Sequence, residues 1–157
     1  MPCRKFLLDE ITSSFQFLTD QFCFEFSSFE YSESCFGNFI ATYSPVKRSM
    51  NAYSIIIQMA LDRSQLFVYV SSTKKPKQCY YLGDIIKLLK SDDAGNHIPS
   101  ERCLYWDEIK WDTNLSWISG QLSLASNQMK SIINLLLNLF TEANYMQTAK
   151  KLNINDK

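Results

Sequence analysis

The chain of 157 residues has a single histidine and only four glycines, and these shortages exclude the familiar catalytic motifs. A Ser-His-Asp or Cys-His arrangement would have to use His97 as its base. His97 stands in a Gly-Asn-His-Ile-Pro stretch with no nucleophile motif beside it, which is typical of a surface loop. The glycines, at positions 37, 83, 95 and 120, form neither of the glycine-rich loops that cradle phosphates. We therefore expect neither an enzyme nor a cofactor.

Net charge is also lacking, because 16 basic residues balance 16 acidic ones. A nucleic-acid-binding domain usually carries a basic excess, so nucleic acid is not the expected partner. The charges are nevertheless unevenly placed. Residues 1–45 hold six acids and two bases, whereas residues 46–90 hold two acids and eight bases. Such blocks either steer a charged partner or simply mark solvated loops.

No pair of cysteines has C-x-x-C spacing, and the total of five is odd. A disulfide framework or a zinc site is therefore not expected, and free thiols in a reduced compartment are the simpler interpretation. The N-terminus has no apolar core of a signal peptide, since Asp9 and Glu10 follow directly after Leu8. The most apolar stretch, residues 129–140, is too short to span a bilayer. We expect a cytoplasmic protein with no membrane association.

Hydrophobic residues make up 46% of the chain and aromatic residues 14%, which is typical of one folded domain over residues 1–157. Apolar residues at helical spacing predict an N-terminal helix over residues 8–22. Alternating patterns predict strands at residues 24–31, 36–43, 54–61 and 66–70. The alternation slips at Ser27-Ser28, which indicates a bulge or a bend. Residues 62–65 predict a tight turn between the last two strands.

Three further segments complete the prediction. Residues 74–77 and 91–104 are expected to be loops, and residues 105–111 alternate weakly, like an edge strand. A short helix is predicted over residues 82–89, and a long one follows Gly120 with an apolar stripe from Met129 to Ala143. The tail from about residue 150 is expected to fray. The fold class is therefore α+β, with an antiparallel sheet of about four to five strands covered by an N-terminal helix and a long C-terminal helix.

Two groups of residues are candidates for a functional site. Asp92 or Asp93 with Glu108 and Lys110 resembles the D…E-x-K triplet of metal-dependent nucleases, in which the acids bind magnesium and the lysine stabilises the attacked phosphate. Ser91 replaces the proline usual in that family, and a charged edge strand explains the triplet equally well. The second group places Trp106 and Trp111 beside Asp107, Glu108 and Asp112, with Trp117 nearby. It is either a protein interface or a small core beneath the long loop.

The width of the apolar stripe on the last helix raises one more possibility. Leu135 and Leu139 extend the stripe beyond one helix face. Either the helix is buried on two sides, or this surplus joins a second chain, as in a homo-oligomer or a subunit of a larger assembly.

The order of motifs over residues 5–90 also has a counterpart in a known group of proteins. A helix is followed by Phe36-Gly37, a strand at residues 55–61, Asp62-Arg63-Ser64-Gln65 between strands, and Tyr81-Leu82-Gly83-Asp84-Ile85-Ile86. This order resembles small bacterial immunity proteins of polymorphic and contact-dependent toxin systems. The resemblance implies a protein that binds a toxin and performs no catalysis.

The leading hypothesis is a non-catalytic, immunity-type inhibitor that caps the active site of a basic toxin domain with an acidic surface. The expected surface is Trp106, Asp107, Glu108, Trp111 and Asp112, followed by Glu25, Glu30 and Glu33. The nuclease and the assembly subunit are the alternatives.

Overall fold

The computed structural model describes residues 4–32, 38–46, 55–62, 65–91 and 115–155, which form five helices and five strands. In chain order these elements are α1 (Arg4–Ser14), α2 (Gln16–Phe22), β1 (Phe24–Ser32), β2 (Asn38–Pro45), β3 (Ile55–Asp62), β4 (Gln65–Ser72), β5 (Lys75–Tyr81), α3 (Leu82–Ser91), α4 (Leu115–Leu139) and α5 (Tyr145–Asn155).

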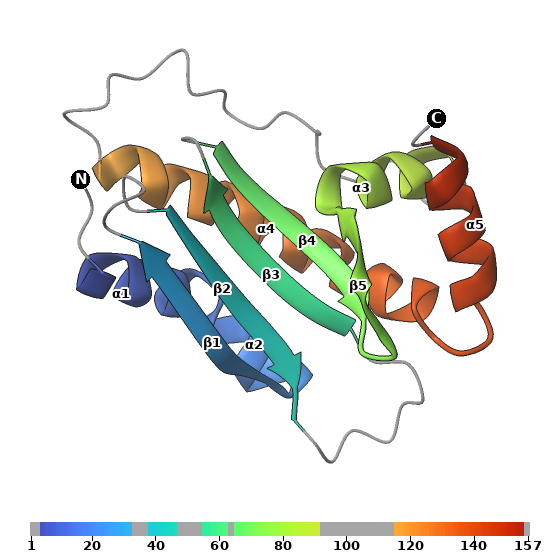
Figure 1. The fold of residues 1–157 in the computed structure, drawn as a ribbon, viewed down its shortest axis with the longest axis horizontal. Helices are drawn as coiled ribbons and strands as arrows, with labels where there is room; N and C mark the ends of the chain where they lie inside the picture. The colour runs from blue at the N-terminus through green and yellow to red at the C-terminus, as the bar shows by residue number, and fades with distance from the viewer. Residues whose placement is uncertain (1–3, 33–37, 47–54, 63–64, 92–114, 156–157) are drawn as a thin grey trace.

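The five strands form one antiparallel sheet in the order β1-β2-β3-β4-β5, so each strand pairs with its neighbours in the sequence. The helices α1, α2 and α4 lie against one face of this sheet, and α3 and α5 pack beyond its β5 edge (Figure 1). The predicted α+β class, the antiparallel sheet and its covering helices at both ends of the chain are therefore confirmed. β3 and β4 pair as the predicted hairpin, with Asp62 paired to Gln65, and residues 63 and 64 of the predicted turn lie outside the described residues.

The long helix α4 supplies the largest part of the cover on that face. Its buried residues recur at intervals of three or four, which places them on one side of the helix. A helix of 25 residues is about 37 Å long at about 1.5 Å per residue, enough to cross the whole sheet. The buried positions of α4 are Ile118, Leu122, Ala125, Met129, Ile132, Ile133 and Leu136.

The predicted N-terminal helix is divided in two at Phe15, which is where the prediction was wrong. Phe15 has φ −108° and ψ 19°, outside the helical range, and its side chain is fully buried beside Tyr43. The amide of Leu18 donates to the carbonyl oxygen of Phe15, which closes a four-residue turn. Ser126 Oγ of α4 donates to the carbonyl oxygen of Ser14 at 2.5 Å and so satisfies an end carbonyl of α1. The break between α1 and α2 therefore directs the side chain of Phe15 into the core.

The segment predicted as a loop at residues 74–77 is mostly strand, since only Thr73 and Lys74 form the turn before β5. Lys74, Lys75, Pro76 and Lys77 are residues typical of a loop, so the sequence pattern does not indicate a strand here. At the edge of a sheet, however, lysine and proline are tolerated and discourage pairing with other chains. Lys75 Nζ lies 5.9 Å from the centre of the Tyr145 ring. The predicted edge strand at residues 105–111 lies outside the described residues.

The C-terminal end also differs from the prediction. The helix α4 starts at Leu115, before Gly120, and ends at Leu139. A further helix, α5, begins at Tyr145, and residues 150–155 of the tail expected to fray belong to it. The side chains of Tyr145 and Leu152 are each 1% exposed. Thr148 Oγ1 donates to the carbonyl oxygen of Leu139 at 2.9 Å, and so fixes α5 to the end of α4. Burial of these apolar side chains explains why a polar-looking tail stays helical.

Burial raises the pKa of the Tyr43 hydroxyl from 10.0 to about 12. Because the folded state holds this proton more tightly than the unfolded chain does, its stabilising effect is complete below pH 10.0 and is lost between pH 10.0 and about 12. Over that interval we expect the unfolding free energy of the natural chain to fall with pH more steeply than that of Tyr43→Phe. The two slopes should differ by up to about 1.4 kcal/mol per pH unit. Urea titrations at several pH values measure this difference. Parallel curves for the two proteins would contradict it.

One strand offers a direct test of one-sided burial. Ile57 is fully buried beneath the helices, whereas its neighbour Ile56 is half-buried on the opposite face. We expect Ile57→Ala to lower the unfolding free energy by about 2–5 kcal/mol and Ile56→Ala to lower it by clearly less. Chemical denaturation of both variants makes the comparison. Equal losses would mean that both faces of β3 are covered.

Candidate functional site

In the part of the chain that the structure describes, no helix covers the face of the sheet opposite α4 (Figure 1). Side chains on a strand alternate between the two faces, so burial and pairing show which residues point there. On β2, Phe39 and Ala41 are buried, whereas Ile40 between them is 41% exposed. We call this side the open face. It comprises Glu25, Ser28, Glu30, Ser32, Asn38, Ile40, Thr42, Ser44, Ile56, Gln58, Ala60, Phe67, Tyr69 and Tyr81.

A β-bulge in β1 decides which residues of that strand reach the open face. Phe26 pairs with Tyr43 and Ser28 pairs with Thr42, so Ser27 is an extra residue without a partner in the register. Its hydroxyl lies 2.8 Å from Ser44 Oγ and donates to the carbonyl oxygen of Thr42 at 3.1 Å. This bulge, which the slip at Ser27-Ser28 predicted, changes the alternation of the strand.

The consequence of the bulge is a complete separation of apolar and acidic side chains in β1. Phe24 and Phe26 before it, and Phe29 and Tyr31 after it, all point to the core face. Glu25 pairs with Ser44 and Glu30 pairs with Ile40, so both carboxylates point to the open face, where both are exposed. Without the extra residue the two glutamates would lie on opposite faces, because five positions separate them.

Three aromatic rings form a cluster at the other end of the open face. The rings of Tyr69 and Tyr81 have their centres 4.9 Å apart, and Phe67 lies 6.0 Å from Tyr69 and 5.9 Å from Tyr81. Tyr81 is 47% exposed. Tyrosine combines a large apolar surface with a polar tip, which suits contacts that are dry on one side and wet on the other.

Between Glu30 and Tyr69 lies a groove of about 580 Å³. Its walls combine the carboxylate of Glu30, the apolar surface of Ile40 and Ala60, and the ring of Tyr69. Among the open-face residues of β1 to β4 there is no lysine or arginine. The groove is therefore shaped and charged for a side chain with an apolar stem and a cationic end.

The residues predicted as site residues have different positions relative to this surface. Glu25 and Glu30 lie on it, and Glu33 lies outside the described residues. Two further groups of predicted residues lie outside the described residues. They are the aromatic and acidic residues Trp106, Asp107, Glu108, Trp111 and Asp112, and the residues Asp92, Asp93 and Lys110 of the nuclease triplet. Within the ranges described, no three histidine, cysteine, aspartate or glutamate side chains are placed to share a metal ion.

The predicted surplus on the C-terminal helix is small in the structure. Leu139 packs against the core, whereas Leu135 remains 37% exposed. A more exposed apolar residue, Met146 at 70%, lies on α5, which the sequence did not predict. Association through these helices stays a prediction.

Sequence reasoning missed the aromatic cluster and the groove. A signal was present, since Phe67 and Tyr69 alternate with Val68 and Val70 and thus give β4 two apolar faces. Such a strand is usually read as buried on both sides. The structure shows instead that Phe67 and Tyr69 are half-buried and pack beside Tyr81, which is 47% exposed.

No described helix is both long and apolar enough to cross a membrane. Comparison of the chain with family models, with curated proteins and with solved structures gave no match. The candidate site therefore rests on its own geometry.

The bulge makes a specific prediction about stability. Deleting Ser27 forces regular alternation, so either the phenylalanines before it or Phe29 and Tyr31 after it must turn to solvent. We expect this deletion to cost at least about 2 kcal/mol of unfolding free energy. Ser27→Ala, the control, keeps the register and loses only exposed hydrogen bonds, a cost of up to about 1 kcal/mol. If the deletion costs no more than the control in urea unfolding, the bulge does not set the faces of β1.

Proposed function

We propose that this chain is a non-catalytic protein-binding module, an immunity-type inhibitor that covers the active site of a basic toxin domain with its open face. The observation that carries the proposal is the composition of that face. It combines two exposed glutamates, a groove and an aromatic cluster, with no basic side chain on β1 to β4.

The contact chemistry favours a partner that presents lysine or arginine. An inserted side chain of this type would lay its alkyl stem along Ile40 and Ala60 and bring its charge to Glu30. The rings of Tyr69 and Tyr81 would then pack around the stem or against a cation, as aromatic residues do at binding hot spots. Catalytic and substrate-binding clefts of nucleases are rich in such cations, because they bind phosphates.

The sheet also supports a fast association. Because the open face is built on paired strands, its side chains are already placed, and little conformational entropy is lost on binding. The two carboxylates on an edge strand would attract a basic surface before contact, which mainly raises the association rate. A rigid acidic surface of this kind blocks access to a cleft without any chemistry of its own.

The test compares three baits in lysate of the source cells: the natural chain, Glu25→Gln/Glu30→Gln, and a control, Asp9→Asn/Glu142→Gln. The control removes the same charge from exposed positions elsewhere, one on α1 and one between α4 and α5. We expect a basic protein to be retained by the natural chain and the control, to elute with salt, and to be lost or weakened with the open-face variant.

The association rate of the isolated pair then gives the decisive number. At low salt we expect the open-face variant to bind about three- to tenfold more slowly and to depend less on salt. Equal slowing by the control variant would show a general charge effect. An unchanged rate in the open-face variant would remove this surface from the proposal.

A further inference from the structure

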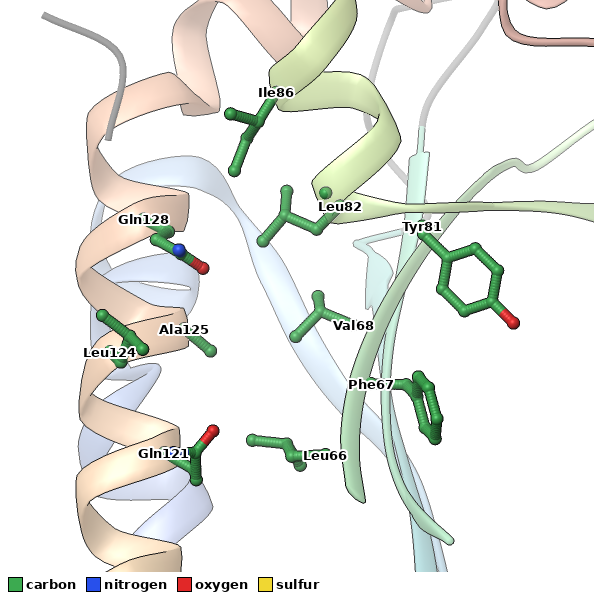
Figure 2. Close-up of a pocket in the computed structure, with 11 residues that line it drawn as sticks. Leu66, Phe67, Val68, Tyr81, Leu82, Ile86, Gln121, Leu124, Ala125 and Gln128 are labelled. Atoms are coloured by element: carbon green, nitrogen blue, oxygen red, sulfur yellow. The ribbon is translucent and has the colours of Figure 1, made fainter. Parts of the chain in front are cut away.

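A cavity of about 150 Å³ lies on the helix side of the sheet, between α3, α4 and β4 (Figure 2). Leu66 and Val68 of β4 form one wall, Leu82 and Ile86 of α3 form the second, and α4 contributes Gln121 and Ala125. In Figure 2 the side chains of Leu66, Val68, Leu82 and Ile86 converge on the space facing α4, whereas the rings of Phe67 and Tyr81 point away to the open face. The cavity is thus separate from the groove described above.

The topology of the sheet explains why this space exists. Tyr81 pairs with Tyr69, and the chain then leaves the sheet to begin α3 at Leu82. The part of β4 before Tyr69 therefore has no pairing with β5. Small residues leave the gap unfilled, because a Cβ added at Gly83 would meet no atom within 4 Å.

Gln121 is the feature that points to a ligand. Its side chain is 4% exposed, and its amide nitrogen Nε2 has no hydrogen-bond partner. Figure 2 shows the side chain extending from α4 toward Leu66, into the cavity. A buried donor left unsatisfied costs about 1–3 kcal/mol, so such groups usually have a partner when the protein is in its working state.

The lining restricts what that partner is. No charged side chain is among the residues that line the cavity, so a buried carboxylate or ammonium would remain uncompensated. Gln121 and Gln128 are the two amide side chains in the lining, both buried and both from α4, and most of the remaining lining is hydrocarbon. A cavity of this volume holds a molecule of about the size of benzene.

We propose that this cavity binds a small, neutral, mainly apolar molecule whose carbonyl oxygen accepts a hydrogen bond from Gln121 Nε2. The ligand class is a cyclic or aromatic ketone or amide of roughly the volume of benzene. The site is independent of the proposed function, because it lies on the other side of the sheet and needs no protein partner.

Cyclohexanone and methylenecyclohexane are the probes, since they have the same shape and only the first has an acceptor oxygen. Both are titrated into the purified chain, with the side-chain amide signal of Gln121 and the methyl signals of Val68 and Ile86 followed by NMR. We expect saturable shifts at these residues with both probes. Because methylenecyclohexane leaves water more readily than the ketone does, the quantity to compare is the ratio of the two affinities, which the Gln121 hydrogen bond should shift about three- to tenfold toward cyclohexanone.

Two variants separate a ligand site from a packing defect. Gln121→Leu should shift this ratio of affinities about three- to tenfold toward methylenecyclohexane, because the ketone then has no donor in the cavity. Ala125→Leu should fill the cavity and abolish binding of both, and Leu66→Phe serves the same purpose if that variant does not fold. An unchanged ratio of the two affinities in Gln121→Leu would overturn the role of Gln121 and the ligand class. Absence of any saturable shift would overturn the site.

Discussion

The burial of one face of the sheet against α4 is the constraint on which the rest of the structure depends. A five-stranded meander has little stability unless a hydrophobic layer covers it, and α4 is the one described helix that runs along the whole sheet. Its buried stripe from Ile118 to Leu136 faces the apolar residues of β2, β3 and β4. Because the described helices cover one face of the sheet, the register of each strand decides which of its side chains point toward α4 and which point away from it.

The two edge strands of the sheet, β1 and β5, each have a feature that suits an edge position. At β1 an extra residue keeps four aromatic residues on the covered side and leaves both glutamates on the other. At β5 the lysines and Pro76 occupy an edge where unpaired backbone would otherwise attract other strands. The two edges consequently differ in charge, and the acidic one borders the groove. The open face therefore carries acidic side chains at its β1 edge, whereas the lysines of the sheet are at its β5 edge.

The parts that the sequence predicted well are those determined by local patterns. Alternation identified β1 to β4, the bulge at Ser27 and the turn before Gln65, because period and turn chemistry involve few neighbouring residues. The break at Phe15 and the helix α5 were missed because they depend on partners far away in the sequence. Phe15 packs beside Tyr43, and the Tyr145 hydroxyl of α5 donates to the side-chain oxygen of Gln78. The strand β5 was missed because Lys75 and Pro76 are typical of loops until the edge of a sheet is known.

The candidate sites were harder to predict for the same reason. Glu25 and Glu30 were recognised as acidic residues, but their common face with Tyr69 depends on the register of four strands. The sequence gives no sign that the amide of Gln121 is buried, since glutamine on a helix is usually exposed. Its burial follows only from the way α3 and α4 meet β4.

The contact between α1 and α4 has a consequence for how the protein is made. Ser14 and Ser126 are 112 residues apart, yet they are joined by a hydrogen bond between helices that share the core. At about 5–20 residues per second, a ribosome needs roughly 6–22 s to synthesise the intervening chain. During that time the apolar sides of α1 and α2 have only the growing sheet to cover them. The strands, each paired with its neighbour in sequence, can assemble first. The nascent chain therefore presents an apolar sheet face that only α1 and α2 cover until α4 emerges, and this is the stage at which it most needs protection from other chains.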